Sequence, residues 1–401
     1  MSDVLTTGPV AGLKASGADC LARARTLIPL LQSAAPRIDA ACELPHDVLD
    51  AMHDAGMFRL LIPRSFGGFE LKPSDYVRCV EAIAIGGASA AWCMNQGSGC
   101  SMTAAYLAPE VAWEIWGGKR DVLAWGQGPG ATAVRAEGGW RCTGTWSFAS
   151  GSRHATWLGA MCPCRNPDGT AVLHPDGRQW ERTMLFRRDF ARIEDVWQVV
   201  GLRGTGSDNY SINELFVDDA HSVTRESATE RRETGLLYRF QAMQLYASGF
   251  ACVGLGTARA ALDAFIALAK EKSQAWSSDR LRDNHAVQHV TGYCDAALKA
   301  ARSGLLSVLD DAWDAVSGSG ELDVANRIAI RQAATFAIHT ARDVVHHVYH
   351  EAGSTAIFDN QPFERRLRDI NSVSQQLQGR RAHFETVGLY LLGGEPSLRW
   401  V

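Results

Sequence analysis

The spacing of apolar and polar residues changes twice along the chain. From residue 12 to about residue 117, stretches rich in Ala and Leu are interrupted by prolines, which begin or end helices. Within this region Tyr76, Val80 and Ile83 recur at helical spacing, so one face of their helix is predicted to be buried. The first part of the chain is therefore predicted to be helical.

Between residues 121 and 217 the pattern is that of short strands. Glycines occur every few residues, Trp, Thr and Val are frequent, and residues 140–146 alternate between apolar and polar side chains. Turn sequences stand at residues 138–139 and 167–169. Several short strands spaced in this way predict a small barrel or sandwich.

Helical spacing returns after residue 222. Long helices are predicted at residues 236–269, 284–316, 324–352 and 368–392. Gly249, Gly254 and Gly256, in the first of them, would let neighbouring helices approach closely. Four such helices joined by short loops predict an antiparallel bundle.

The predicted fold is thus mainly α with a β-domain. Residues 1–120 are expected to form an N-terminal helical domain, residues 121–222 a central β-barrel domain and residues 223–401 a C-terminal four-helix bundle. A chain of 401 residues is long enough for two or three packed units.

Composition and charge narrow the class of protein. Hydrophobic residues make up 46% and charged residues 21%, as in a soluble globular protein. A net charge of -4 offers no basic field for phosphates, which argues against a nucleic-acid partner. We see no apolar run approaching the length of a transmembrane helix and no signal-peptide pattern at the N-terminus, so we expect a cytoplasmic protein without a membrane partner.

Cysteines and histidines give little indication of a metal site. The ten cysteines are scattered through apolar segments, as reduced core thiols are. His346, His350 and Glu351 could face one ion on a predicted helix, but no further ligand can be named. We therefore expect no metal.

Four motifs then indicate a family. They are residues 62–68 (IPRSFGG), residues 144–151 (GTWSFASG), residues 202–208 (LRGTGSD) and residues 362–370 (PFERRLRDI). With them the chain resembles the acyl-CoA dehydrogenase superfamily over nearly its whole length, and most closely its branch of two-component flavin-dependent monooxygenases.

The chain departs from this family at its proton-transferring positions. In the dehydrogenases a glutamate base follows the Arg-Asp pair by about nine residues, and counting from Arg368 gives Leu377. The monooxygenases often carry histidines where this chain has Gln376 and, in an N-terminal helix, Gln96. An amide cannot take up a proton at neutral pH, so these two residues would orient ligands by hydrogen bonds.

The resemblance implies roles for further residues. Ser150 would lie beside flavin N5, Trp146 and Phe148 would flank the flavin ring, and the polar residues of a glycine-rich turn would reach its edge or a phosphate. The turn residues are Arg203, Thr205 and Ser207, and Gly353, Ser354 and Arg365 would receive the flavin phosphate from a neighbouring subunit.

The expected function is that of an oxygenase component. It would accept reduced FMN or FAD from a separate flavin reductase and use O2 to hydroxylate an aromatic or heteroaromatic small molecule, or to oxygenate an amine, as a homotetramer. One alternative is an FAD-dependent desaturase or oxidase like the acyl-CoA dehydrogenases, with a relocated base. Another is a flavin-binding homologue without catalytic activity.

Overall fold

Helices occupy the first part of the chain in the computed structural model, which describes residues 15–174, 177–225, 227–273, 279–398 and 401. The helices are α1 (Gly17–Thr26), α2 (Ile28–Ala41), α3 (His46–Asp54), α4 (Pro73–Gly86), α5 (Ala88–Ser101) and α6 (Pro109–Trp116). Prolines stand at the first turns of α2, α4 and α6, where the missing N–H costs nothing. This confirms the predicted helical character of the region.

A single sheet follows, made of β1 (Leu123–Trp125), β2 (Thr132–Ala136), β3 (Gly139–Ala149), β4 (Trp157–Arg165), β5 (Glu181–Arg187), β6 (Arg192–Glu194), β7 (Asp208–Asp218) and β8 (Ser222–Val223). Its order is β6-β7-β3-β2-β4-β5-β8, with β1 paired to β4. The predicted barrel is not closed: among the described residues β6 and β8 stand at opposite ends of the sheet and are not paired. With three and two residues, these end strands offer few backbone groups for closure.

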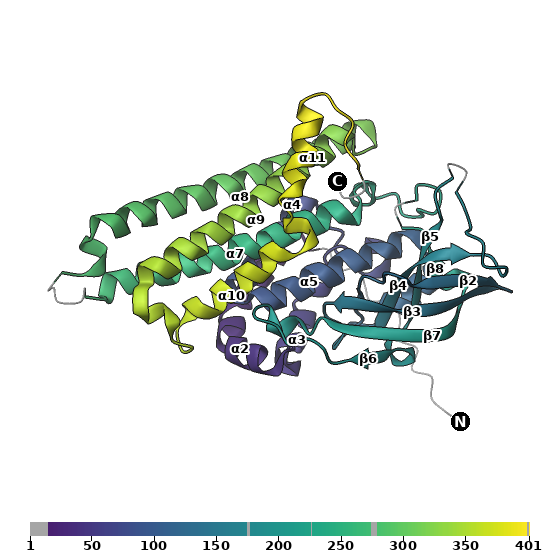
Figure 1. Cartoon of the computed structure of the whole chain (residues 1–401), viewed down its shortest axis with the longest axis horizontal. Helices are drawn as coiled ribbons and strands as arrows, with labels where there is room; N and C mark the ends of the chain where they lie inside the picture. The colour runs from purple at the N-terminus through teal and green to yellow at the C-terminus, as the bar shows by residue number, and fades with distance from the viewer. Residues whose placement is uncertain (1–14, 175–176, 226, 274–278, 399–400) are drawn as a thin grey trace.

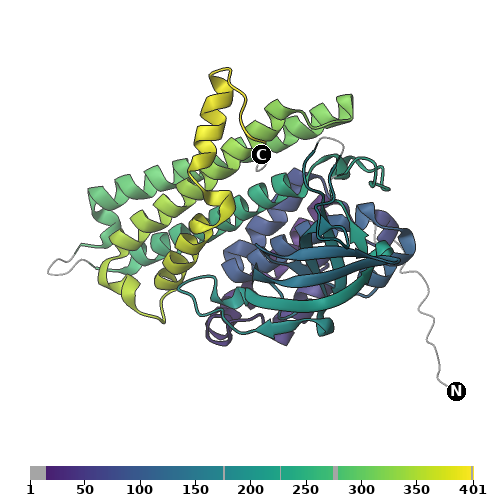
Figure 2. The same cartoon turned by 45° about the vertical axis from the view of Figure 1, so that its right-hand side comes forward.

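In the described residues after the sheet the α-helices are α7 (Ala242–Glu271), α8 (His285–Ser319), α9 (Val324–Ala352), α10 (Pro362–Gln375) and α11 (Ala382–Leu391). Helices α7 to α10 lie side by side as the predicted bundle, with the sheet at the other end of the molecule (Figure 1). The prediction of one last helix over residues 368–392 is wrong. The chain is extended at Gln376 and turns through η10 (Leu377–Gly379), so that α11 leaves the bundle at a steep angle (Figure 2).

Helix α7 joins the parts of the fold, because it contacts α4, α5, α9 and α10. Two of its glycines permit this, as predicted: a Cβ on Gly249 would overlap Asn95 Oδ1, and one on Gly256 would overlap the carbonyl of Glu81. Contrary to the sequence expectation, α7 is long and apolar enough to cross a membrane by length and composition. Of that apolar window 67% is buried inside the fold, as in a core helix.

Candidate functional site

Two turns meet where β3 ends. Phe148 adopts a left-handed conformation with φ 59°, and Gly151, with φ 82°, donates its N–H to the carbonyl of Thr205. Positive φ is readily adopted by glycine and is uncommon for a phenylalanine, so the first turn is held in place by its surroundings. The second turn, η5 (Arg203–Thr205) with Leu202 and Gly206, therefore lies directly against Ser150.

A chain of buried hydroxyl groups links these turns to α5. The indole Nε1 of Trp92 donates to Ser150 Oγ at 2.9 Å, and Ser150 Oγ lies 2.7 Å from Ser207 Oγ. Ser207 Oγ lies 2.7 Å from Thr205 Oγ1, which donates to the carbonyl of Leu202 at 2.8 Å. The structure thus brings together three of the predicted residues and adds Trp92.

Helix α10 fixes the second turn. The N–H of Leu202 donates to Asp369 Oδ1 at 2.7 Å, and Arg368 Nη1 donates to the carbonyl of Val200 at 2.8 Å. Burial, partly offset by the Leu202 N–H, raises the pKa of Asp369 to about 6. Arg203 turns away toward α2, where its Nε donates to the carbonyl of Asp39 at 3.1 Å. In this structure Arg203 is therefore an anchor of the turn.

The two glutamines occupy different surroundings. Gln376 accepts a hydrogen bond from the N–H of Gln378 at 2.7 Å, while its own Nε2 is buried and has no partner among the described residues. Gln96 Nε2 lies 3.4 Å from the hydroxyl of Tyr246 and 3.6 Å from Cys100 Sγ. Gln376 therefore presents an unused buried donor, whereas Gln96 belongs to a polar cluster of protein groups.

Aromatic side chains that the sequence analysis did not select line the same region. Trp92 packs on Phe250 with ring centroids 4.0 Å apart, and Phe250 stacks on Tyr246, one turn earlier in α7, at 5.9 Å. Burial raises the pKa of Tyr246 well above its usual range and that of Cys100 to about 12, so both stay protonated at neutral pH. The i,i+4 spacing of Tyr246 and Phe250 was the available signal for this wall.

The two predicted ring-flanking aromatics lie in different places. Trp146 is fully buried in the sheet's own core, stacked on Tyr210 at 5.4 Å, with its Nε1 donating to the carbonyl of Met161. It has no free face for a flavin ring. Phe148 is 64% exposed and meets Trp197 edge-on at 6.2 Å. Of the two, only Phe148 can reach a ligand without unpacking the core.

Two of the predicted phosphate residues, Gly353 and Ser354, lie far from Ser150 within one chain. The third, Arg365, lies in α10 one turn before Asp369, which accepts from the N–H of Leu202. Gly353 and Ser354 follow α9 and are exposed, close to Lys272, which ends α7 and donates to the carbonyl of Ala352 at 2.9 Å. Phe250, beside the hydroxyl chain, lies 22 residues earlier in the same helix. At the rise of an α-helix the separation is about 30 Å, so these residues could serve only a neighbouring subunit's flavin.

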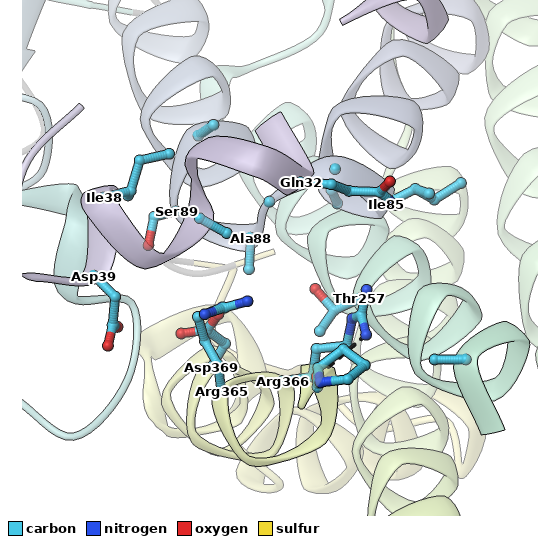
Figure 3. A pocket seen from close by; sticks show the side chains of 17 residues that line it. Gln32, Ile38, Asp39, Ile85, Ala88, Ser89, Thr257, Arg365, Arg366 and Asp369 are labelled. Atoms are coloured by element: carbon cyan, nitrogen blue, oxygen red, sulfur yellow. Dashed lines mark hydrogen bonds between the residues drawn. The ribbon is translucent and has the colours of Figure 1, made fainter. Parts of the chain in front are cut away.

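A cavity of about 310 Å³ lies between α2, the junction of α4 and α5, α7 and α10 (Figure 3). Side chains of Ser89, Thr257, Arg365 and Arg366 line it, and Ser89 stands one helical turn before Trp92. Burial, and then the charge of Arg365, lowers the pKa of Arg366 to about 10. Ser150 is not among the lining residues. The cavity adjoins the hydroxyl chain through Ser89 of α5 and through Asp369 of α10, which accepts from the N–H of Leu202.

The histidines considered as metal ligands include His346, which lies in α9. His346 Nε2 lies 3.1 Å from Asn371 Oδ1. Within the described ranges, no three His, Cys, Asp or Glu side chains are grouped so as to hold an ion.

Comparison with known proteins identifies the class. Residues 28–111 match the family model "Acyl-CoA dehydrogenase, N-terminal domain", and residues 248–378 match "Acyl-CoA dehydrogenase, C-terminal domain". The chain belongs to the acyl-CoA dehydrogenase superfamily.

Relatives place it more closely. The chain is 28% identical over 393 residues to indole-3-acetate monooxygenase of Pseudomonas putida, covering 96% of this chain and 97% of that protein. It is 26% identical to the oxygenase component of FADH(2)-dependent resorcinol hydroxylase of a Rhizobium species, covering 92% of each chain. The structure of XiaF from a Streptomyces species, in complex with FADH2 and glycerol, has the same fold. The TM-score is 0.88 at 22% sequence identity, and the comparison covers 96% of this chain and 98% of that chain. Within the superfamily the chain is a flavin-dependent monooxygenase.

The residues present fit a flavin as the cofactor. Ser150 offers a hydroxyl oxygen at the meeting point of the two turns, and Phe148 offers an exposed ring. Gln376 offers a buried N–H donor to which no other described residue is bonded. Leu377, which the sequence motif predicts at the dehydrogenases' base position, lies in η10. The site thus holds hydrogen-bonding groups and apolar walls, and Leu377 cannot take up a proton.

Proposed function

We propose that this chain is the oxygenase component of a two-component system, which takes reduced FMN or FAD from a separate reductase and hydroxylates an aromatic or heteroaromatic small molecule with O2. The observation that carries the proposal is the buried hydroxyl chain around Ser150, placed beside an aromatic wall in which the titratable groups stay protonated. When bound, the reduced flavin supplies the electrons with which dioxygen is activated.

Each residue of the site has a task in this scheme. Ser150 holds the N5 edge of the ring, and Gln376 Nε2 donates a hydrogen bond to the flavin or the substrate. Trp92, Phe250 and Tyr246 exclude water and offer flat faces to an aromatic substrate. Because Gln96 and Gln376 cannot accept a proton, the favoured substrates are those that need little help from a base: an activated ring, or an amine.

The relatives favour an aromatic ring over an amine. Their names refer to indole-3-acetate and resorcinol, both of them electron-rich aromatic compounds. The amine remains the second candidate substrate class.

The decisive experiment adds chemically reduced FMN or FAD under nitrogen, then ¹⁸O-labelled dioxygen with a panel of indoles and phenols. We expect one labelled oxygen atom in the product by mass spectrometry, and quenching of flavin fluorescence on binding. Bleaching of bound oxidised FAD by an acyl thioester, without any reductase, would instead support the desaturase alternative. Flavin binding without product or substrate turnover would support a non-catalytic homologue.

The assembly and location belong to the same proposal. If Gly353 and Ser354 bind the flavin phosphate, their distance from Ser150 means that a second copy must supply them, which supports an oligomer such as the proposed homotetramer. Exposed apolar residues on and after α11 offer a contact surface. All ten cysteines lie in the described part of the chain as free thiols, which favours the reducing cytoplasm.

A further inference from the structure

The hydroxyl chain has a fixed direction. A threonine or serine hydroxyl carries one hydrogen, and the carbonyl of Leu202 can only accept, so the hydrogen of Thr205 is used there. Thr205 Oγ1 must then accept from Ser207, and Ser207 Oγ must in turn accept from Ser150. By elimination, the hydrogen of Ser150 points at Ser207 and away from a ligand.

This leaves Ser150 as an acceptor. Its oxygen has two lone pairs, and one of them receives the N–H of Trp92, an indole group that can only donate. The second lone pair has no partner among the described residues. A ligand at Ser150 is therefore matched best by an N–H or O–H group.

The two redox states of a flavin differ at this atom. N5 carries a hydrogen and donates in the reduced ring, whereas in the oxidised ring N5 has a lone pair and accepts. We infer that Thr205 and Ser207 act as positioning residues that hold Ser150 as an acceptor and so make the site prefer reduced flavin. This inference rests on the proposed function, and it gives the oxygenase a means of selecting the reductase's product over oxidised flavin.

The surroundings favour this direction over the reverse one. Ser150, Ser207 and Thr205 are all buried, so their hydroxyl groups bond mainly to one another and to the carbonyl of Leu202. The N–H of Leu202 is fixed by Asp369. Three donors reach the carbonyl oxygen of Leu202, and the hydroxyl of Thr205 makes the shortest contact, at 2.8 Å against 3.1 Å for both the Thr205 N–H and Trp197 Nε1. The carbonyl of Leu202, at which the chain of hydroxyl groups ends, is thus held in a fixed position.

The test measures the dissociation constants of oxidised and reduced flavin by fluorescence, the latter under nitrogen, together with the midpoint potential of the bound flavin. In Thr205→Val, Ser207 loses its acceptor and donates to Ser150, whose hydrogen is then free for oxidised N5. We expect the preference for reduced flavin to fall about three- to tenfold, the range of one hydrogen bond. A tenfold fall corresponds to a potential about 30 mV lower for a two-electron couple.

Matched variants distinguish the effect of hydrogen-bond direction from the effect of altered side-chain packing. Thr205→Ser keeps the hydroxyl and should restore the preference. Ser207→Ala removes the acceptor of Ser150 and should lower the preference by a second route, also if Thr205→Val fails to fold. Ser152→Ala is the control: it deletes a buried hydroxyl that donates to the carbonyl of Gly206 and does not belong to the hydroxyl chain. The ratio of the dissociation constants of oxidised and reduced flavin should stay within twofold of that of the unmodified protein.

The outcomes distinguish this inference from the function on which it rests. If the unmodified protein binds flavin in neither state, the proposed function fails. If it binds reduced flavin more tightly and both Thr205→Val and Ser207→Ala leave that preference unchanged, the assigned direction of the hydroxyl chain is refuted and the function stands.

Discussion

At the residue scale, the side chain of Gln376 uses only one of its two polar groups within the described part of the chain. Its Oε1 accepts from the N–H of Gln378 at 2.7 Å, and this bond helps to hold the turn after α10. Its Nε2 is buried and lacks a partner among the described residues. A buried donor without a partner costs free energy, and a ligand that accepts from it recovers that cost.

Replacing Gln376 should therefore weaken ligand binding. We expect Gln376→Leu to raise the dissociation constant of reduced flavin or of substrate about three- to tenfold, because one hydrogen bond is lost. Fluorescence titration under nitrogen measures the first constant, and the KM of the hydroxylation reports on the second. Gln375→Leu, at the exposed neighbouring position, is the control and should change neither. Equal effects of the two substitutions would contradict a role for the Nε2 group.

Asp369 should make stability depend on pH. Its pKa is raised by burial to about 6, so between pH 4 and pH 6 the folded state keeps a proton that the unfolded state has lost. Stability must then fall as the pH rises through this window, by about 3 kcal/mol in total. Asp369→Asn cannot ionise and still offers an oxygen to the Leu202 N–H.

Urea denaturation at pH 5 and pH 8 measures this effect. From pH 5 to pH 8 the free energy of unfolding of Asp369→Asn should gain about 1.5 kcal/mol relative to the parent, roughly half of the full effect. A difference that stays constant between the two pH values would show that burial does not raise this pKa.

At the scale of elements, the close approach of α5 and α7 depends on Gly249. A Cβ there would overlap Asn95 Oδ1, which accepts from the hydroxyl of Tyr76 at 2.6 Å. We expect Gly249→Ala to lower the free energy of unfolding by about 1–3 kcal/mol through overpacking. Gly292, in the exposed face of α8 with open space around it, provides the control. Gly292→Ala should raise the free energy of unfolding by about 0.5–1 kcal/mol. Thermal denaturation of the two variants measures both changes.

Local patterns predicted the elements well where tertiary contacts do not intervene. The helices expected at residues 284–316 and 324–352 are α8 and α9, with ends that differ by three residues at most. The break in the last predicted helix was missed because one of the contacts at the break is distant: Arg331 of α9 donates to Gln378 Oε1 at 2.6 Å. Locally, Gln376 caps the N–H of Gln378. Apolar spacing carries no information about such contacts.

The site was predictable to a similar degree. The motif of residues 144–151 indicated Ser150, and that of residues 202–208 indicated Thr205 and Ser207. The bond from Trp92 joins positions 58 residues apart, and no local pattern reveals it. Trp146 alternates with polar neighbours as a ligand-facing aromatic would, and only the packing of the sheet shows that its face is turned inward.

At the scale of the whole molecule, the surface of α11 should control assembly. Leu391 and Leu392 are 69% and 88% exposed, and Leu389 beside them is exposed as well. Burying such residues between copies would stabilise an oligomer. We expect the double substitution Leu391→Glu and Leu392→Glu to lower the molar mass measured by light scattering. Leu173→Glu, an equally drastic change on the sheet side of the molecule, should leave it unchanged. An unmodified protein that runs at the mass of one chain would rule out the homotetramer.

The length of α7 separates the Ser150 turn from Gly353 by about 30 Å in any one chain. In the proposed assembly each copy therefore contributes the Ser150 region to one flavin site and Gly353 and Ser354 to another, and no copy contains a complete site. The catalytic unit would then depend on protein concentration as well as on sequence. On dilution, cofactor retention and turnover should be lost together as the copies separate, even though every chain remains folded.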